Sequence, residues 1–361
     1  MDKYFLPIKA EITGDFAPGG TTRQNHSTAT QYLSGRSMRG AFASIWPRGE
    51  LGNDEFLNKF CRGDIWFSGL FPLEERVNRY PYRTPLSAYT CKYGGLKHGI
   101  YDLCDDSSQA SNCCSVCKAE LSRVSSPFLL RMDDGNIVPF SLKQEVRINN
   151  NIANRAKRTL KDGVFSTDII KKNQHMIGWL YGEKAQLNEF VGKISTAPDN
   201  SFNLSFGRRK KAGSPLKCNF DELIAFAATN THLKVQRRIV VMLQTPAIFL
   251  DKWFNPCFPD KSFFFSDSVS DLVEMNLEKT FTASCEINGW SGVHGLPCAP
   301  MKSFDSGSVF SFEIKTEDPD EIESISDDVF RIYDEGIGEM RNVGFGRVEI
   351  AYPTTDGGAD V

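Results

Sequence analysis

The stretch Gly336-Ile-Gly-Glu-Met-Arg-Asn-Val-Gly-Phe-Gly-Arg-Val-Glu-Ile350 is a glycine-rich loop that leads directly into a predicted strand near the end of the chain. Its glycines can adopt positive φ and allow the backbone to approach a bulky partner closely. Arg341 and Arg347 add cationic, fork-shaped donors that match phosphate geometry. The loop therefore predicts a phosphate contact, and the strand after it completes the pattern of the second half of the chain.

Apolar periodicity and turn signals place the same order of elements in both halves of the chain. The first half has strand 4–16, helix 34–46, strands 140–148 and 175–181, helix 183–194, and a strand and loop at 202–217 that contains Gly207-Arg-Arg-Lys-Lys-Ala-Gly213. The second half has strand 238–250, helix 267–276, strands 281–288 and 308–315, helix 318–335, the glycine-rich loop and strand 347–352. Each half is therefore predicted to be a ferredoxin-like βαββαβ unit.

These patterns predict an α+β protein with two tandem ferredoxin-like (RRM-like) domains, residues 1–235 and 236–361. Residues from about 47 to 139 are rich in Pro, Gly, Ser and Cys and are expected to form an irregular, zinc-binding insertion in the first domain.

The composition is that of a soluble globular protein, with 361 residues, 40% hydrophobic and 24% charged. No stretch reaches the roughly 18 apolar residues of a membrane span, and the start of the chain lacks a signal-peptide pattern. We therefore expect a cytoplasmic protein with no membrane contact. In that reducing compartment, ten cysteines favour free thiols and a metal site over a disulfide framework.

The net charge of −3 hides a strong asymmetry along the chain. Residues 1–140 have 16 Lys and Arg against 15 Asp and Glu, residues 141–240 have 18 against 8, and residues 241–361 have 8 against 22. Glycine and aromatic residues interleave with the basic block, as is typical of nucleic-acid surfaces. The basic middle predicts a polyanion as partner, whereas the acidic last third is a poor nucleic-acid groove and favours docking on a basic neighbour.

A cysteine cluster in the insertion predicts a metal site. Cys114-Ser-Val-Cys117 has the spacing that lets two thiolates bind one tetrahedral Zn²⁺, and an insertion poor in apolar residues gains stability from such a site. We assign the ligands to Cys91, Cys104, Cys114 and Cys117. Cys113 can replace Cys114, and His98 can replace Cys104, because imidazole also binds Zn²⁺. Four protein ligands leave no open position, so the zinc is expected to be structural.

Four motifs carry a resemblance to a known superfamily. They are Ile337-Gly-Glu-Met-Arg-Asn-Val-Gly-Phe-Gly-Arg-Val348, Leu33-Ser-Gly-Arg-Ser-Met-Arg-Gly-Ala41, Gly289-Trp-Ser-Gly followed by Gly295-Leu-Pro, and Ser306-Gly-Ser-Val-Phe310. In this order they resemble the RAMP superfamily of CRISPR-associated proteins. Members of that superfamily carry one or two ferredoxin-like domains and a glycine-rich loop between the last helix and the last strand.

Within the superfamily, the insertion, Glu145-Val-Arg-Ile-Asn-Asn-Asn-Ile-Ala-Asn-Arg155 and Gly163-Val-Phe165 are most similar to the Csx-ten family. These proteins are the Cas-five-like subunits of type III-D effector complexes, and the likeness covers nearly the whole chain. It implies a non-catalytic subunit that caps the ribonucleoprotein and holds the repeat-derived 5′ handle of the crRNA in antiviral defence. It also implies contacts with the large subunit and the adjacent RAMP backbone subunit, and only indirect contact with target RNA.

A single-stranded RNA handle requires cations along a groove and a flat side chain on which a base can stack. The candidate cations lie at the entrance of helix 34–46, on a predicted hairpin arm and on the two glycine-rich loops: Arg36, Arg39, Arg147, Arg155, Lys157, Arg158, Arg208, Arg209, Lys210, Lys211 and Arg341. Phe165 or Phe206 would supply the stacking surface. For Arg347, an intramolecular pair with the acidic helix before the loop is the alternative to a phosphate contact. Ser214-Pro215 follows the first loop where relatives tend to have a further glycine.

Two other classes of function remain open, although we expect no enzymatic activity. A crRNA-processing endoribonuclease of the RAMP superfamily would use His26 as general base. A metal-dependent nuclease would use Asp102, Asp105 and Asp106, which we expect to cap turns instead. A protein-only scaffold subunit is the remaining hypothesis, and the acidic last third of the chain favours it.

Overall fold

The structure, a computed structural model, describes residues 3–19, 22–23, 26–77, 79–104, 113–152, 159–195, 197, 199–206, 216–225, 237–291 and 296–350. The chain divides into two compact units. Unit 1 comprises Met1–Pro81 and Phe140–Thr229, and unit 2 comprises Tyr82–Pro139 and Asn230–Val361. The expected domain boundary at residue 235 stays a prediction. The units group residues 82–139 with the second half of the chain rather than with the first.

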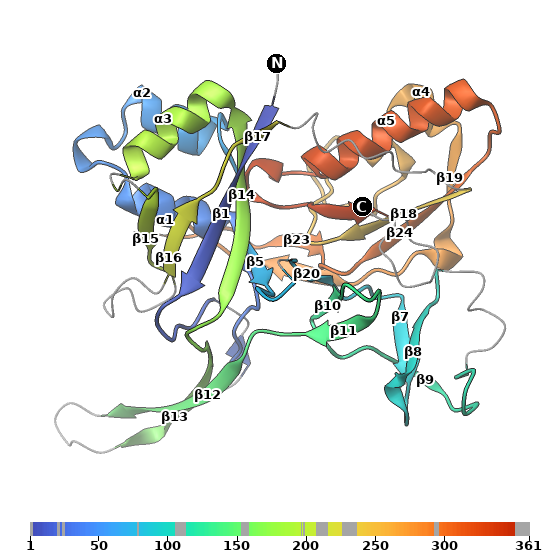
Figure 1. The fold of residues 1–361 in the computed structure, drawn as a ribbon, viewed down its shortest axis with the longest axis horizontal. Coiled ribbons are helices and arrows are strands. Elements are labelled where there is room, and N and C mark those ends of the chain that lie inside the picture. The colour runs from blue at the N-terminus through green and yellow to red at the C-terminus, as the bar shows by residue number, and fades with distance from the viewer. Residues whose placement is uncertain are drawn as a thin grey trace. The chain divides into compact units, whose positions relative to one another are not determined.

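Unit 1 is built on an antiparallel sheet with helices packed against it (Figure 1). The sheet order is β15-β16-β1-β14-β5-β4, with β17 also paired to β1. Its strands are β1 (Lys3–Ile12), β4 (Leu33–Ser34), β5 (Trp66–Leu73), β14 (His175–Glu183), β15 (Ser201–Leu204), β16 (Leu216–Phe220) and β17 (Ile224–Ala225). The helices are α1 (Gly35–Ile45), α2 (Asp54–Leu57) and α3 (Lys184–Ile194). A smaller sheet has the order β12-β13-β3-β2 and is formed by β2 (Thr22–Arg23), β3 (His26–Ser27), β12 (Gln144–Ile152) and β13 (Thr159–Ile170).

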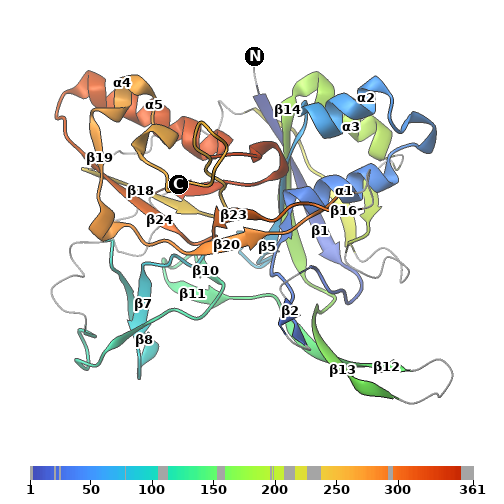
Figure 2. The ribbon, with the colours of Figure 1, turned by 180° about the vertical axis from the view of Figure 1, so that it is seen from behind.

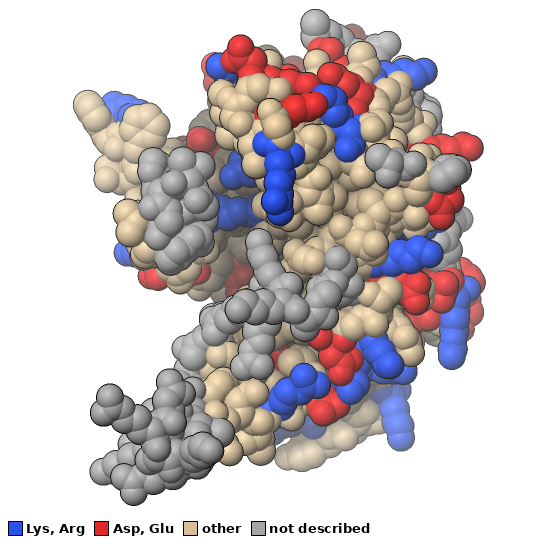
Figure 3. All heavy atoms as spheres, turned by 90° about the vertical axis from the view of Figure 1, so that its left-hand side faces the viewer, with Lys and Arg blue, Asp and Glu red and all other residues tan. Residues whose placement is uncertain are grey.

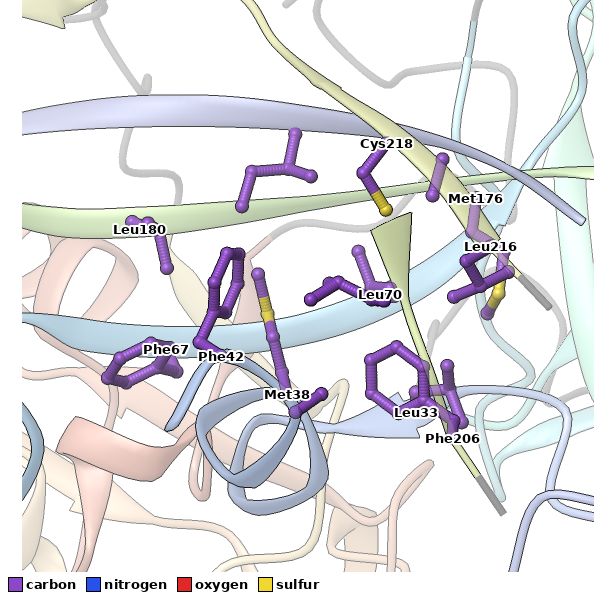
Figure 4. Close-up of a cluster of buried hydrophobic side chains, with 14 of the residues drawn as sticks. Leu33, Met38, Phe42, Phe67, Leu70, Met176, Leu180, Phe206, Leu216 and Cys218 are labelled. Atoms are coloured by element: carbon purple, nitrogen blue, oxygen red, sulfur yellow. The ribbon is translucent and has the colours of Figure 1, made fainter. Parts of the chain in front are cut away.

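The first helix forms where the sequence predicts it. Ser34 is the N-cap, and its hydroxyl accepts a hydrogen bond from the Ser37 N–H at 3.3 Å. Met38 and Phe42, four residues apart, are fully buried and lie against the sheet with Leu70 and Cys218 (Figure 4). The entrance of α1 is therefore held firmly on the sheet of unit 1.

Strand β5 lies inside the region that we expected to be irregular. Every residue of β5 after Trp66 is buried. Its sequence therefore lacks the alternation of apolar and polar residues that marks a half-exposed strand. A short apolar run that contains Gly69 and Pro72 does not identify a strand by periodicity. The expected irregular region 47–139 is thus interrupted by residues 66–73, which belong to the sheet, and by further short strands between residues 82 and 139.

Unit 2 contains a second antiparallel sheet, of order β19-β24-β18-β25, with α5 packed against it (Figure 2). Its strands are β18 (Arg238–Leu243), β19 (Val273–Met275), β24 (Val309–Ile314) and β25 (Val348–Ile350), and its helices are α4 (Asp267–Ser270) and α5 (Pro319–Glu335). The peripheral strands are β6 (Tyr82–Arg83), β7 (Ala88–Cys91), β8 (Gly95–Asp102), β9 (Leu121–Arg123), β10 (Phe128–Arg131), β11 (Ile137–Phe140), β20 (Ser284–Ile287), β21 (Trp290–Ser291), β22 (Leu296–Pro297) and β23 (Met301–Phe304).

One expected helix of this half is wrong, and one expected strand pairs outside the sheet. The expected helix 267–276 ends at Ser270, and residues 273–275 form the edge strand β19. The expected strand 281–288 forms β20 but pairs with β23 outside the sheet. The helix α5 matches its prediction, because Asp318 caps it, Pro319 occupies its first turn, and Ile325, Val329 and Ile332 are buried on one face.

The α+β class is confirmed, with antiparallel sheets in both units. The finer description as tandem ferredoxin-like domains stays a prediction. None of the helices in the described part of the chain combines the length and the hydropathy of a membrane-spanning segment.

Candidate metal centre and RNA-facing elements

A small sheet of unit 2 brings one histidine and three cysteines together. In this sheet β7 pairs with both β8 and β9, and the turn 114–117 precedes β9. The ligand atoms of Cys91, His98, Cys114 and Cys117 all lie within 4.8 Å of one another. Three soft thiolates and one imidazole are a donor set that suits Zn²⁺ in a closed tetrahedral site.

The four side chains face each other in a compact group. Cys91 Sγ lies 3.4 Å from Cys117 Sγ, and Cys114 Sγ lies 3.4 Å from His98 Nδ1. The Gly94 N–H donates to Cys91 Sγ at 3.1 Å, and Tyr101 Oη lies 3.4 Å from Cys114 Sγ. Backbone and hydroxyl groups around the sulfur atoms orient them as outer-shell partners orient metal ligands.

The surroundings of the Cys91 and Cys114 sulfur atoms favour thiolates, whereas the pKa of the Cys117 thiol is raised. Burial opposes ionisation of Cys114, but hydrogen bonds from Tyr101 and from nearby backbone N–H groups outweigh it and lower the pKa of the thiol to about 5. The Gly94 N–H lowers the pKa of Cys91, and hydrogen bonding to Cys114 raises the pKa of His98. Because metals bind the thiolate, the lowered pKa values of Cys91 and Cys114 favour a metal in the cluster, whereas the raised pKa of His98 opposes it, since a metal binds the neutral imidazole.

The structure does not bring one of the assigned ligands into the cluster. Cys104 lies outside the cluster, and its thiol donates to the Lys279 carbonyl at 3.2 Å in a buried apolar group with Tyr82 and Leu129. His98, the alternative to Cys104, takes the fourth position, and Cys113 is not part of the cluster. The sequence signal for His98 is Gly94-Gly95, since the chain turns back there. A Cβ on Gly94 would lie 2.3 Å from the His98 ring.

The predicted hairpin arm is present in unit 1 as β12 and β13, which pair antiparallel. Arg147 pairs with Thr167 and Asn149 with Phe165, so Arg147 and Phe165 share one face of the arm. Arg147 is exposed and forms an ion pair with Asp15 at 3.5 Å, and Phe165 is half-buried. Val146, Ile148 and Val164 are exposed on the opposite face. Arg155, Lys157 and Arg158 lie outside the described residues.

The other candidate RNA-binding residues of unit 1 have mixed surroundings. Arg36 and Arg39 are half-buried on α1, and Arg39 donates to the Phe60 carbonyl at 3.2 Å. Phe206 is only 6% exposed and packs in the core, so it cannot be a stacking surface. Arg208, Arg209, Lys210 and Lys211 lie outside the described residues.

The glycine-rich loop 336–346 folds onto its own unit rather than opening as a cradle. The Ile337 N–H donates to the Gly346 carbonyl at 2.9 Å, and the Gly346 N–H donates to the Pro246 carbonyl at 2.8 Å. Arg341 pairs with Glu335 at 3.2 Å. Arg347 donates to the Asp334 carbonyl of α5 at 2.8 Å, so its expected rival partner, the acidic helix, is confirmed.

The residues considered for catalysis are engaged within the protein. His26 Nδ1 lies 2.7 Å from Ser166 Oγ, and His26 Nε2 lies 3.4 Å from Asp168 Oδ1, so both ring nitrogens face groups of β13. Asp102 is buried and accepts a hydrogen bond from the Cys104 N–H at 2.9 Å, which is the turn-capping role expected for it. Asp105 and Asp106 lie outside the described residues.

Charge is distributed rather than gathered on the face shown in Figure 3. Lys and Arg side chains are interspersed with Asp and Glu side chains over the described atoms of that face. Lys171, for example, lies 2.7 Å from Glu145 and 3.3 Å from Asp15 at the base of the arm. The excess of positive charge in residues 141–240 therefore depends largely on the two segments 153–158 and 207–215, which lie outside the described residues.

A family sequence model described as CRISPR-associated protein (Cas_Cmr3) matches residues 131–351, more than half of the chain. The chain therefore belongs to the Cas_Cmr3 family of CRISPR-associated proteins. The match includes the arm and both glycine-rich loops. The expectation of a CRISPR-associated protein is confirmed at this level, and none of the curated proteins matches the chain.

Solved CRISPR structures contain chains similar to this one. A chain of the type III-B Cmr-beta complex bound to cognate target RNA has a TM-score of 0.45 and 12% identity, with 96% of each chain covered. A chain of Cmr-beta with cognate target RNA and AMPPnP has a TM-score of 0.43 and 11% identity, with 86% of each chain covered. Cas6 of Thermus thermophilus has a TM-score of 0.40 and 7% identity, with 97% of this chain and 99% of that chain covered.

Proposed function

We propose that this protein is a non-catalytic, crRNA-binding subunit of a type III CRISPR effector complex and holds the 5′ handle of the crRNA at one end of the ribonucleoprotein. The observation that carries the proposal is the match to the CRISPR-associated family across the basic block and both glycine-rich loops. The sequence resemblance to the Csx-ten family further favours a type III-D complex, with the large subunit and a RAMP backbone subunit as neighbours.

The chemistry of the arm supports an RNA contact. Arg147 and Phe165 share a face, which gives a cation for phosphate beside a flat ring for a base. Further cations, Arg155, Lys157 and Arg158, follow in the segment that joins the two strands. The arm pairs with β3 at Ser166 and Thr167, so its part beyond these residues is a two-stranded ribbon, which is marginally stable by itself and gains stability when a partner covers it.

The sheet orders support tandem ferredoxin-like domains. In unit 1, β14 lies between β1 and β5, and in unit 2, β24 lies between β18 and β19. In each unit, the third core strand therefore lies between the first and the second, which is the split arrangement of a βαββαβ unit. This assignment is part of the proposal.

The engagement of His26 favours a binding role over catalysis. A general base needs a ring nitrogen within reach of the substrate hydroxyl, and both nitrogens of His26 face Ser166 and Asp168. We therefore propose that His26 holds the base of the arm against β3 rather than cleaving RNA.

RNA binding by the purified protein tests this proposal. A fluorescent RNA with the repeat-handle sequence should bind with an affinity that falls steeply between about 0.05 and 0.3 M salt, and it should remain intact. A scrambled RNA of equal length reports sequence preference. Cleavage without added metal that His26→Ala abolishes would contradict the non-catalytic role.

We also propose that Cys91, His98, Cys114 and Cys117 hold a structural Zn²⁺. The fit rests on four ligand atoms that lie within 4.8 Å of one another and on hydrogen bonds that favour the thiolate of Cys114. Such an ion would tie β7, β8 and the turn 114–117 together.

Metal analysis of matched variants tests this site. The wild-type protein should contain about one zinc per chain, and His98→Ala and Cys114→Ser should lose it. Cys104→Ala is the matched control and should keep its zinc, because that thiol contacts the Lys279 carbonyl instead. Loss of zinc in Cys104→Ala with retention in His98→Ala would restore the sequence-based ligand set.

A further inference from the structure

The turn at residues 251–258 of unit 2, called here the aromatic turn, carries large exposed aromatic side chains at its tip. Trp253 is 72% exposed and Phe254 is 83% exposed, while Phe258 beside them is 51% exposed. Aromatic side chains of this size are normally buried, since they remove much apolar surface from water. Their grouping on one turn indicates a contact that the isolated chain does not make.

A single carboxylate fixes the shape of the tip. Asp251 Oδ1 accepts hydrogen bonds from the N–H groups of Trp253 at 2.8 Å and Asn255 at 2.9 Å. The Asp251 N–H donates to the Asn255 carbonyl, and the Phe254 N–H donates to the Asp251 carbonyl, both at 2.9 Å. Phe254 has a φ of +63°, which a bulky residue rarely adopts unless its surroundings hold it there. A partner would therefore meet a tip that is already ordered.

The base of the turn is anchored in the core of unit 2. Leu250 and Pro256 form an isolated bridge, and the Cys257 N–H donates to the carbonyl of the buried Phe249 at 3.1 Å. The Phe258 ring packs edge-on against the Phe304 ring, with 5.6 Å between centroids. Trp253 and Phe254 thus stand on a rigid support.

The charge around the turn disfavours RNA as the occupant. Residues 251–274 contain five Asp and Glu against two Lys. Lys261 pairs with Asp271 at 3.5 Å, and Lys252 lies over the Trp253 ring at 5.6 Å. Burial raises the pKa of Cys257, and the nearby carboxylates Asp251 and Asp260 raise it further. Phosphates would be repelled here, whereas a rim of Lys and Arg would be attracted.

We propose that the aromatic turn is a protein docking site, where Trp253 and Phe254 insert into an apolar pocket rimmed by Lys and Arg on an adjacent subunit of the effector complex. Tryptophan and other aromatic anchors in desolvated pockets carry most of the binding energy of protein interfaces. Ordering of the tip before binding removes part of the entropic cost of association. The identity of the partner as a sister subunit rests on the proposed function.

Reconstitution with purified sister subunits and crRNA tests the inference. The double variant Trp253→Ala with Phe254→Ala should bind its neighbouring subunit at least about tenfold more weakly. Its midpoint of thermal unfolding should not change, because both side chains are exposed in the free protein. Leu277→Ala is the matched control, since Leu277 is 67% exposed in the same unit, and it should assemble like the wild type.

Two further variants separate positioning from contact. Asp251→Ala keeps both aromatic rings but releases the turn, so it should weaken assembly by an intermediate factor. Asp251→Asn keeps an acceptor oxygen and should recover most of the affinity. If Asp251→Ala assembles like the wild type, preorganisation of the turn is wrong.

A photoreactive phenylalanine analogue at position 254 identifies the occupant. The expected result is a crosslink to a protein subunit, and a crosslink to crRNA would overturn the docking site. Wild-type assembly that the double variant leaves unchanged would also overturn it while the proposed function stands. Failure of the wild-type protein to join any sister subunit would instead overturn the proposed function, and with it this choice of partner.

Discussion

The β12–β13 arm of unit 1 and the glycine-rich loop of unit 2 both carry arginines, and both are candidate phosphate contacts in the sequence. In the structure the two segments differ in what they expose. The arm leaves Arg147 and Ile148 exposed, whereas the loop directs its backbone groups to its own unit, with Glu339 N–H donating to the Ile248 carbonyl at 2.9 Å. A Cβ on Gly338 would lie 2.3 Å from that same carbonyl oxygen. Glycine can therefore be required for close internal packing as readily as for the approach of a ligand.

The largest effect is expected from filling the tightest point of the glycine-rich loop. Gly346 has a φ of +66°, and a Cβ on it would lie 1.8 Å from the Ile337 carbonyl oxygen. Gly346→Ala should cost at least about 3 kcal/mol of unfolding free energy, since backbone must shift on both sides. Urea denaturation of the purified variants measures this cost.

The matched control is Gly40→Ala in α1, where a Cβ meets no atom within 4 Å. Because alanine is a better helix former than glycine, this variant should gain up to about 1 kcal/mol or stay unchanged. If Gly346→Ala were as stable as the wild type, the loop would not be closely packed. The proposed difference between a packed loop and an exposed arm would then be wrong.

The second largest effect is expected on RNA affinity. Replacing Arg155, Lys157 and Arg158 with alanine should weaken binding of the handle RNA more than about tenfold and should reduce the salt slope by about 2 to 3. Arg341→Ala should change the affinity little, because its guanidinium already pairs with Glu335 at 3.2 Å. Titrations by fluorescence anisotropy at several salt concentrations compare the two. Equal losses in both variants would mean that the loop also contacts RNA.

A pH-dependent effect is expected at the strand after the loop. Burial raises the pKa of Glu349 from its ordinary 4.5 to about 7, and Gln244 and Arg347 offset this only in part. A carboxyl whose pKa is raised by folding contributes stability that is complete below about pH 4.5 and is lost as the pH rises through 7. Between about pH 5 and pH 8 the wild type should therefore lose roughly 1 to 3 kcal/mol relative to Glu349→Gln. If the unfolding free energies of the wild type and Glu349→Gln changed in parallel with pH, the raised pKa of Glu349 would be contradicted.

Local signals in the sequence predicted local structure well. Ser34 caps α1, Asp318 caps α5, and Cys114 and Cys117 converge because two intervening residues suffice to bring their thiols together. The arm was also predicted as a hairpin, but its second strand, β13, was not predicted. At the two caps and in the cysteine pair, the residues that interact lie within about one turn of chain, so the pattern of residue types is enough.

Contacts between distant segments were harder to predict. The fourth metal-cluster residue is His98 because Gly94 and Gly95 turn β8 back beside β7, while Cys104 faces the Lys279 carbonyl 175 residues further along the chain. Residues 273–275 look helical by local pattern, yet they form β19 because β24 offers them an edge for pairing. Tertiary pairing outweighs weak local propensity in such short segments.

The sequence by itself determined the CRISPR-associated class of protein, the α+β class, the main helices and the cysteine pair, because each depends on residue types at fixed short spacing. Only the tertiary structure decided that His98 joins the cluster, that Phe206 is buried in the core, and that the glycine-rich loop closes on itself. It also revealed that Trp253 and Phe254 stand exposed on a locked turn. The physical reason is that burial and side-chain proximity are set by which distant strands pair, and spacing along the chain does not specify that pairing.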